Sequence, residues 1–347
     1  MKREVWLDKL KVVATIFVVL LHVNGYAYDT FGNSMSSSQL ICMNVIEAAA
    51  YCAIHLFVMC GAFIMLEKSP KSKNFIAIYS QTWIVCIIGL VAAIAMELAF
   101  SKVQLIQSIF PFIGRAYWFV SDYLVLMFLA PFLNKLIHDL ANRELLKLTI
   151  IVALIVSILP LLPSEFIWKE NCCGITLFIF LYLIVACVKT SKIKINAYIY
   201  FSVYIACSML LVLSYYLLAK LNVASSRYFY SYYNPIVILQ ALSLFMCFYS
   251  QSNRMGVYIP KDKKVLTLSV DNSLLCYLLH MHPIIKNYYS GGVLNFLNIK
   301  GIGYAFAIIA FALCVFCGCT FLGIPIKRLS ELIVNKTDQY IKRGNNV

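Results

Sequence analysis

Two ionisable side chains on the first apolar segment, Lys11 and His22, are spaced so that they could do chemistry together. They lie within the run WLDKLKVVATIFVVLLHVNGY, residues 6–26. In a helix, eleven residues bring a side chain back to within about 20° of its starting direction and advance it by about 16 Å. One helix face would therefore carry a cation near a membrane surface and an imidazole near the midplane. Because ionisable groups at that depth are costly, the pair indicates a functional site, with chemistry carried across a membrane.

Other polar residues interrupt the later apolar segments at a depth similar to that of His22. Counted from the predicted membrane edges, Glu47, Asp122, His280 and His282 all fall between the midplane and the outer leaflet. A shared depth indicates a site or cavity. The alternative is that each side chain forms a structural hydrogen bond between helices or faces water near the rim.

A dense aromatic run, Arg227-Tyr-Phe-Tyr-Ser-Tyr-Tyr233, lies in a predicted outer loop. Aromatic faces can stack on sugar rings, so Arg227, Tyr230 and Tyr232 are candidate substrate contacts. An interfacial aromatic girdle would give the same composition. His55, just past the midplane of the second apolar segment, is a further candidate for substrate binding, and so is His282; the alternative for each is a structural histidine.

The elements that must position these residues are membrane-spanning helices. The 347-residue chain is 62% hydrophobic and 13% charged, and its mean hydropathy is +0.83, whereas soluble domains contain about 25% charged residues. We predict an all-α, polytopic integral membrane bundle that forms a single domain over residues 1–347, with no separate soluble domain. Ten apolar runs are long enough to cross a bilayer; they are residues 8–28, 41–66, 75–99, 117–137, 145–163, 174–188, 196–219, 235–250, 267–289 and 301–325.

The distribution of lysine and arginine orients these spans. With the N-terminus inside, 22 of the 29 basic residues fall in inner segments and seven in outer ones. This excess is typical of cytoplasmic loops, so both termini are predicted to be cytoplasmic in a multi-pass plasma-membrane protein. The net charge of +14 is therefore interpreted as a topology signal, and nucleic acid is not an expected partner. The oligomeric state is left open.

The remaining sequence features argue against several other classes of site. Most of the 13 cysteines lie in predicted spans, where cysteine packs as a small apolar residue. Cys314 and Cys317 could present two thiols on one helix face, but no clustered His or Cys completes a metal site, and none is expected. No phosphate-binding glycine loop, His-Glu-x-x-His signature or nucleophile elbow occurs. There is also no internal repeat of the kind common in secondary transporters.

The first span resembles that of the membrane acyltransferase-3 family, the integral-membrane sugar O-acyltransferases. Their first helix carries Arg or Lys followed, after ten intervening residues, by His, which Lys11 and His22 match. Further stretches are similar to the family and occur in its order: HLFVMCGAFIMLEK (55–68), YWFVSDYLVLMFLAPFL (117–133), YYNPIVILQALSLF (232–245) and SLLCYLLHMHPII (273–285).

The resemblance implies an enzyme that transfers an acyl group, acetyl by family default, from cytosolic acyl-CoA to a hydroxyl of a glycan or lipid-linked sugar outside the cytosol. Acetyl-CoA would be a co-substrate, with no tightly bound cofactor. His22 is expected to act as the general base, or as an acyl carrier in a covalent variant. Asp122 or Glu47 would orient its ring, and His280 would stabilise the oxyanion or bind the acceptor.

The donor end departs from the family pattern. Many members carry Arg-x-x-Arg at the inner end of the third span, whereas this chain has Lys71 and Lys73. We expect these lysines to help Lys11 hold the phosphates of the donor. Two other functions stay open at this point: a transporter or flippase for a small solute or lipid-linked sugar, and a family member that has lost catalysis.

Overall fold

Some of the helices begin at residues whose side chains satisfy free backbone N–H groups. The computed structural model describes residues 3–162, 174–191, 196–222, 225–286 and 302–344. Helix α2 (Ser37–Ala50) starts after Ser36, whose hydroxyl accepts from the Gln39 N–H while the Gln39 side chain accepts from the Ser36 N–H. Helix α10 (Pro235–Tyr249) combines a capping Asn234 with a proline at its first position. Proline needs no hydrogen-bond partner there, so both starts follow from the sequence.

Apolar helices account for nine of the ten predicted spans. Seven helical stretches in the described residues are long and apolar enough to cross a membrane, and α8 (Ile175–Thr190) and α10 are shorter apolar helices. This confirms the prediction of a helical membrane bundle. The seven are α1 (Val5–Phe31), α2 with α3 (Ala53–Glu67), α4 (Ser72–Ala95), α6 (Trp118–Asp139), α7 (Asn142–Ala153) with the π and 3-10 turns that continue to Leu161, α9 (Ala197–Leu221) and α15 (Gly303–Gly344).

The predicted span 267–289 forms two short helices instead of one long one, α12 (Lys264–Asp271) and α13 (Ser273–His280). Between them, the Asn272 side chain donates to the Leu268 carbonyl at 2.9 Å and so satisfies a carbonyl at the end of α12. Helix α13 ends at His280, three residues before Pro283, because the residue that precedes a proline disfavours helical geometry. Residues 287–289 of this predicted span lie outside the described residues.

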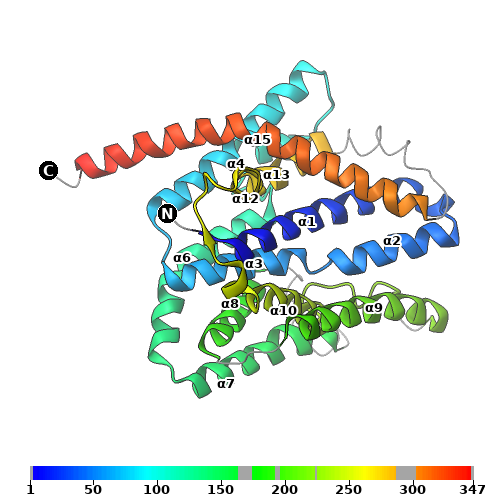
Figure 1. Ribbon diagram of the computed structural model, residues 1–347. Helices are drawn as coiled ribbons and strands as arrows, with labels where there is room; N and C mark the ends of the chain where they lie inside the picture. The colour runs from blue at the N-terminus through cyan, green and yellow to red at the C-terminus, as the bar shows by residue number, and fades with distance from the viewer. Residues whose placement is uncertain (1–2, 163–173, 192–195, 223–224, 287–301, 345–347) are drawn as a thin grey trace.

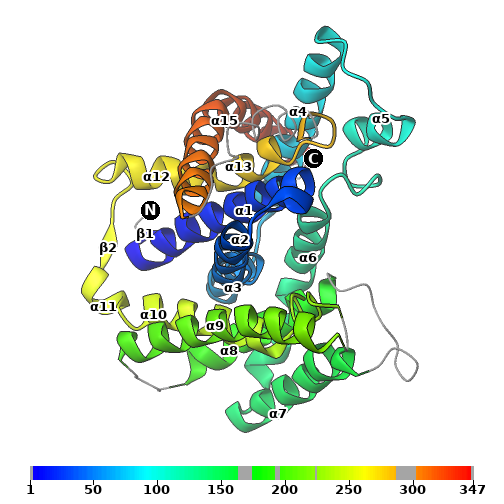
Figure 2. The ribbon, with the colours of Figure 1, turned by 90° about the vertical axis from the view of Figure 1, so that its right-hand side faces the viewer.

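Helix α1 runs through the middle of the bundle. It packs against α2, α3, α10, α12, α13 and α15. Figure 2 shows α7, α8, α9 and α10 on one side of α1–α3, and α4, α12, α13 and α15 on the other. The second half of α15, which contains Pro325, extends beyond the bundle toward the C-terminus (Figure 1). Helix α1 therefore contacts both halves of the molecule along its length.

The start of α1 is fixed by one large aromatic contact. Trp6 is fully buried, and its ring meets Phe63, Phe245 and Tyr249 edge-on at centroid distances of 5.0, 5.5 and 5.3 Å. Edge-to-face packing is a preferred arrangement of aromatic rings. These contacts lock α1 between α3 and α10, which sets the height and rotation of Lys11 and His22.

Short elements cover the end of the bundle where α1 begins. Strand β1 (Arg3–Glu4) pairs antiparallel with β2 (Val257–Tyr258), which follows the short helix α11 (Ser252–Met255). At the opposite end, α5 (Lys102–Ile109) packs against α4. The β1–β2 pair brings the chain after α10 back to the start of α1 and leads it into α12.

Candidate functional site

Two imidazole rings meet where α1 packs against α13. The Nδ1 atom of His22 lies 2.9 Å from Nε2 of His280, which is a hydrogen-bond distance. His280 is buried, with 3% of its surface exposed, whereas His22 is partly exposed. The sequence placed both residues at one depth, and the structure shows that they are in direct contact.

The hydrogen bond on the far side of His280 defines the protons of this pair. His280 Nδ1 lies 2.6 Å from the carbonyl oxygen of Cys276, and a carbonyl can only accept. Nδ1 of His280 therefore carries a proton, and in the neutral ring Nε2 is the acceptor. His22 then donates from Nδ1, which leaves a lone pair on its own Nε2. Within the described part of the chain, no residue bonds that nitrogen, so it can take a proton from a substrate.

Aromatic and apolar side chains surround the pair. The Tyr277 ring lies 6.4 Å from that of His22 and 6.1 Å from that of His280. The Tyr26 hydroxyl donates to the sulfur of Met281 at 3.4 Å, which ties α1 to the chain just after α13. Water is scarce in such surroundings, so hydrogen bonds to the imidazoles are stronger than they would be in solvent.

His282, which we expected to bind substrate, has a structural role. It is 1% exposed, its Nε2 donates to the Cys86 carbonyl on α4 at 3.3 Å, and its Nδ1 accepts from the N–H groups of Ile284 and Ile285 at 3.3 and 3.4 Å. A Cβ at Gly89 would lie 2.2 Å from Nε2, so only glycine leaves room for the ring. These partners use both ring nitrogens, so the structure gives no support to the predicted contact between His282 and a substrate.

Lys11 belongs to an ion-pair network at the start of α1. Its Nζ lies 3.9 Å from the Asp8 carboxylate, which also binds Arg3 at 2.7 Å and accepts from the Tyr258 hydroxyl at 2.7 Å. Arg3 continues the network to Asp271 at 2.7 Å. Burial lowers the pKa of the Arg3 guanidinium, but its bonds to Asp271 and Asp8 raise it, and the net shift is upward. The network holds the beginning of α1 to the end of α12 and leaves Lys11 partly exposed.

The two lysines expected to assist Lys11 lie apart from this network. Lys73 is exposed in the first turn of α4, and Lys71 is exposed just before it. The Lys71 backbone N–H donates to the Asn74 side chain at 2.9 Å. Neither lysine contacts Lys11 among the described contacts. Their predicted role in holding a donor is therefore not supported by a shared site with Lys11.

Each of the two candidate carboxylates is paired with an arginine. Glu47 accepts two hydrogen bonds from Arg227, one of 3.0 Å and one shorter, and Asp122 lies 3.6 Å from Arg115. Burial lowers the pKa of Arg227, but the hydrogen bond and charge of Glu47 raise it, and the net shift is upward. Neither carboxylate contacts His22 among the described contacts, so their predicted role in orienting its ring has no support in this geometry, whereas His280 lies within hydrogen-bond distance of His22. Asp122 Oδ2 is buried and has no partner in the described residues.

The predicted substrate contacts gather in one aromatic cluster. Tyr51 stacks on Tyr232 at 5.1 Å, and its hydroxyl donates to the Tyr230 carbonyl at 2.7 Å. Arg227 lies 5.3 Å above the Tyr230 ring. His55 is fully buried beneath the cluster and donates from Nε2 to the Tyr232 carbonyl at 2.7 Å. His55 thus supports the loop through Nε2, its Nδ1 has no hydrogen-bond partner in the described residues, and its contact with substrate stays a prediction.

Several contacts that shape the site had no clear signal in the sequence. The Cys276 carbonyl that orients His280 is four residues before it, which is ordinary helical spacing. Gly89 and Cys86 lie in the middle of an apolar run, and nothing in that run indicates that they contact His282. Among the described residues, no group of three or more His, Cys, Asp or Glu side chains is arranged to hold a metal ion.

Comparison with known families identifies one that covers most of the chain. A family described as "Acyltransferase domain" matches residues 4–323, a range that includes both imidazoles of the pair. Neither the curated proteins nor the solved structures give a significant match.

Proposed function

The chain belongs to this acyltransferase family, and we propose that it is a plasma-membrane O-acyltransferase. In this proposal it moves an acetyl group from cytosolic acetyl-CoA to a hydroxyl of a cell-envelope or exported glycan, either free or lipid-linked. The observation that carries the proposal is the hydrogen-bonded series from the Cys276 carbonyl through His280 to His22. It presents a basic nitrogen on the partly exposed ring and buries the orienting ring behind it.

The reaction follows from the protons assigned to the pair. Nε2 of His22 removes the proton from the acceptor hydroxyl as that oxygen attacks the thioester carbon. The carbon–sulfur bond then breaks, and the CoA thiolate takes the same proton from His22. The products are an acetyl ester and CoA, and His22 returns to its neutral form.

His280 makes His22 a better base without reacting itself. When His22 is protonated, its Nδ1–H bond to Nε2 of His280 becomes charge-assisted, and such bonds are roughly twice as strong as neutral ones. The bond to Cys276 holds His280 in the accepting tautomer throughout. His280 is therefore a positioning residue in this mechanism, comparable to the group that orients the histidine of a hydrolytic triad.

The two substrates would approach from opposite ends of α1. Acetyl-CoA is polyanionic and cytosolic, and Lys11, about 16 Å along the helix from His22, provides a partly exposed cation on the predicted cytoplasmic side. The glycan would bind at the outer half, where Arg227, Tyr230 and Tyr232 form an aromatic cluster suited to sugar rings. Asp122 offers a carboxylate oxygen without a partner in the described residues, which could accept from a sugar hydroxyl.

The test uses membranes that contain the protein, incubated with acetyl-CoA labelled in the acetyl group. We expect label to enter glycan only when the protein is present. Uptake of label or solute without transfer would instead identify a transporter. Absence of both would identify a member that has lost catalysis.

A further inference from the structure

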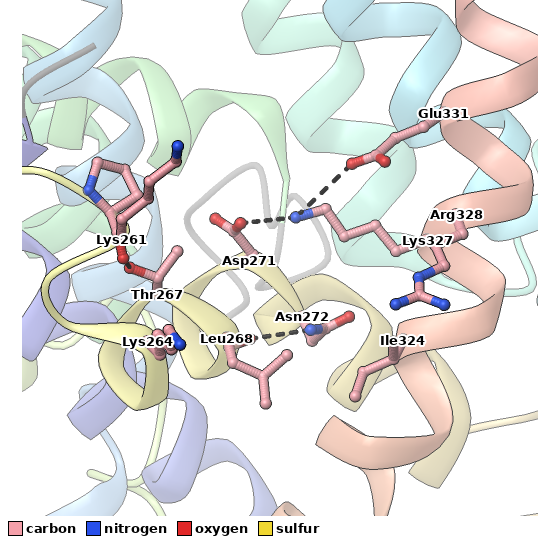
Figure 3. Close-up of a pocket in the computed structure, with 11 residues that line it drawn as sticks. Lys261, Lys264, Thr267, Leu268, Asp271, Asn272, Ile324, Lys327, Arg328 and Glu331 are labelled. Atoms are coloured by element: carbon pink, nitrogen blue, oxygen red, sulfur yellow. Dashed lines mark hydrogen bonds and ion pairs between the residues drawn. The ribbon is translucent and has the colours of Figure 1, made fainter.

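A pocket of about 410 Å³ lies where the chain around α12 faces the second half of α15. Figure 3 shows Lys261 and Lys264 on the α12 side, with Lys327 and Arg328 on α15 across from them. Asp271 on its wall binds Arg3 at 2.7 Å, so the pocket adjoins the start of α1. It therefore lies at the end of the bundle that the lysine and arginine distribution predicts to be cytoplasmic.

The acidic groups of the pocket are already neutralised. One oxygen of Asp271 binds Arg3, and the other binds Lys327 at 2.7 Å. Glu331 lies 3.9 Å from the same lysine (Figure 3). Neither acid is thus available to balance the other cations of the pocket.

Three further cations on the wall, Lys261, Lys264 and Arg328, form no ion pair within the described part of the chain. All three are exposed. A second hollow of about 690 Å³ shares Lys261 and Lys264 with the pocket and adds two more cations, Lys9 and Lys263, and one acid, Asp262. Cations that outnumber the acids on a concave surface raise the local potential and attract anions.

We propose that the pocket between α12 and α15 binds phosphate groups, held by Lys264 and Arg328 with Lys261 at the rim. The arginine supplies a planar fork that matches two phosphate oxygens, and the lysines supply point charges. The site is separate from Lys71 and Lys73 and would give this chain a phosphate-binding surface in the absence of an Arg-x-x-Arg pair.

The walls of the pocket are held in place by contacts that do not involve its free cations. The Thr267 hydroxyl donates to the Pro260 carbonyl at 3.0 Å, which fixes the loop before α12. Helix α15 packs closely on Asn272, because Gly323 has no side chain and a Cβ there would lie 2.8 Å from the amide oxygen. The cations thus project from a defined scaffold.

Phosphate could come from the nucleotide end of the acyl donor or from an anionic lipid headgroup, and the geometry favours the donor. Asn272 and His280 lie at the two ends of α13, whose eight residues span about 12 Å. A pantetheine arm that ran beside α13 would bring the thioester from the pocket to the imidazole pair. This assignment of the source rests on the proposed function, whereas phosphate binding itself does not.

The experiment measures binding to the purified full-length protein in a neutral detergent. The probes are CoA, dephospho-CoA and fluorescent phosphatidylglycerol in mixed micelles. The test variant is K264Q/R328Q. The control is K135Q/R143Q, which removes the same charges from exposed positions on the same predicted side. Melting temperatures of both variants establish that the fold is intact.

We expect K264Q/R328Q to weaken CoA binding by about tenfold or more, since two of the cations that would face the phosphates are lost. The control should bind CoA as the wild type does. Loss of phosphatidylglycerol binding instead would support the phosphate site and assign it to lipid. Unchanged binding of every probe would overturn the proposal. An H22A protein that still binds CoA in a Lys264- and Arg328-dependent way would uphold the pocket even if acyl transfer were never observed.

Discussion

Replacing Gly89 with alanine tests how α13 is held in place. The added Cβ would lie 2.2, 2.5 and 2.6 Å from three atoms of the His282 ring, and real contacts of this kind do not come so close. The ring is buried on all sides, so it must leave its position between α4 and the end of α13. Because that end also carries His280, we expect Gly89→Ala to lower both stability and acyl transfer.

The loss of stability in Gly89→Ala can be estimated from the hydrogen bonds and the packing of the His282 ring. It makes three hydrogen bonds of 3.3 to 3.4 Å, each contributing about 0.5–1 kcal/mol. Overpacking of a filled interior adds about 1–3 kcal/mol. Alanine in a helix gains up to about 1 kcal/mol over glycine. The expected net loss in the free energy of unfolding is therefore about 1.5–5 kcal/mol.

The assay is the denaturation midpoint of the purified protein in detergent. Gly25→Ala is the matched control, because no atom lies within 4 Å of the Cβ position there; that variant should be as stable as the wild type or more so. In the double variant Gly89→Ala/His282→Ala the clash is gone, so it should be no less stable than His282→Ala alone. A Gly89→Ala protein with unchanged stability, or effects that simply add, would refute the reasoning.

Two further predictions concern side-chain pairs. His280→Ala should lower kcat for acyl transfer about 10²-fold with little change in KM for acetyl-CoA. His280→Gln should recover part of that loss, because the glutamine amide oxygen can accept a hydrogen bond from His22. Equal losses in both variants would contradict a positioning role. In a double-mutant cycle of stability, Glu47→Gln and Arg227→Gln should show a coupling free energy of about 0.5–1 kcal/mol. The pair is bidentate, which strengthens it, but the Arg227 side chain is 41% exposed, which weakens it. A coupling near zero would show that the pair forms no effective bridge.

Much of the fold could be predicted from the sequence because lipid imposes simple rules. The lengths of the apolar runs predicted nine of the ten spans. The eleven-residue spacing predicted that Lys11 and His22 share one face of α1. The exception, residues 267–289, shows the limit of hydropathy. Its composition suits a single span, but the Asn272 side chain donates to the Leu268 carbonyl at the end of α12. Pro283 disfavours helical geometry in the residue before it, so α13 stops short of it. Local hydrogen bonding decided the outcome there.

The partners of the polar residues could not be predicted, because depth in a membrane says nothing about lateral position. Glu47 and Arg227 are separated by 180 residues, and only the packing of α2 against the loop before α10 brings them together. His280 was expected at the depth of His22, yet its contact with that residue depends on how α13 packs on α1. His282 was expected to contact substrate, but its ring packs against Gly89 of α4 and donates to the Cys86 carbonyl.

The central claim is that His22, oriented by His280, is the base for acyl transfer. The most direct test compares the rate of labelled acetyl transfer in membranes that carry His22→Ala or His138→Ala at equal protein levels. His138 is the control, since its side chain is 90% exposed at the end of α6. We expect His22→Ala to lower the rate of transfer by about 10² to 10⁴-fold and His138→Ala to keep the wild-type rate. Wild-type transfer by the His22→Ala protein would contradict it.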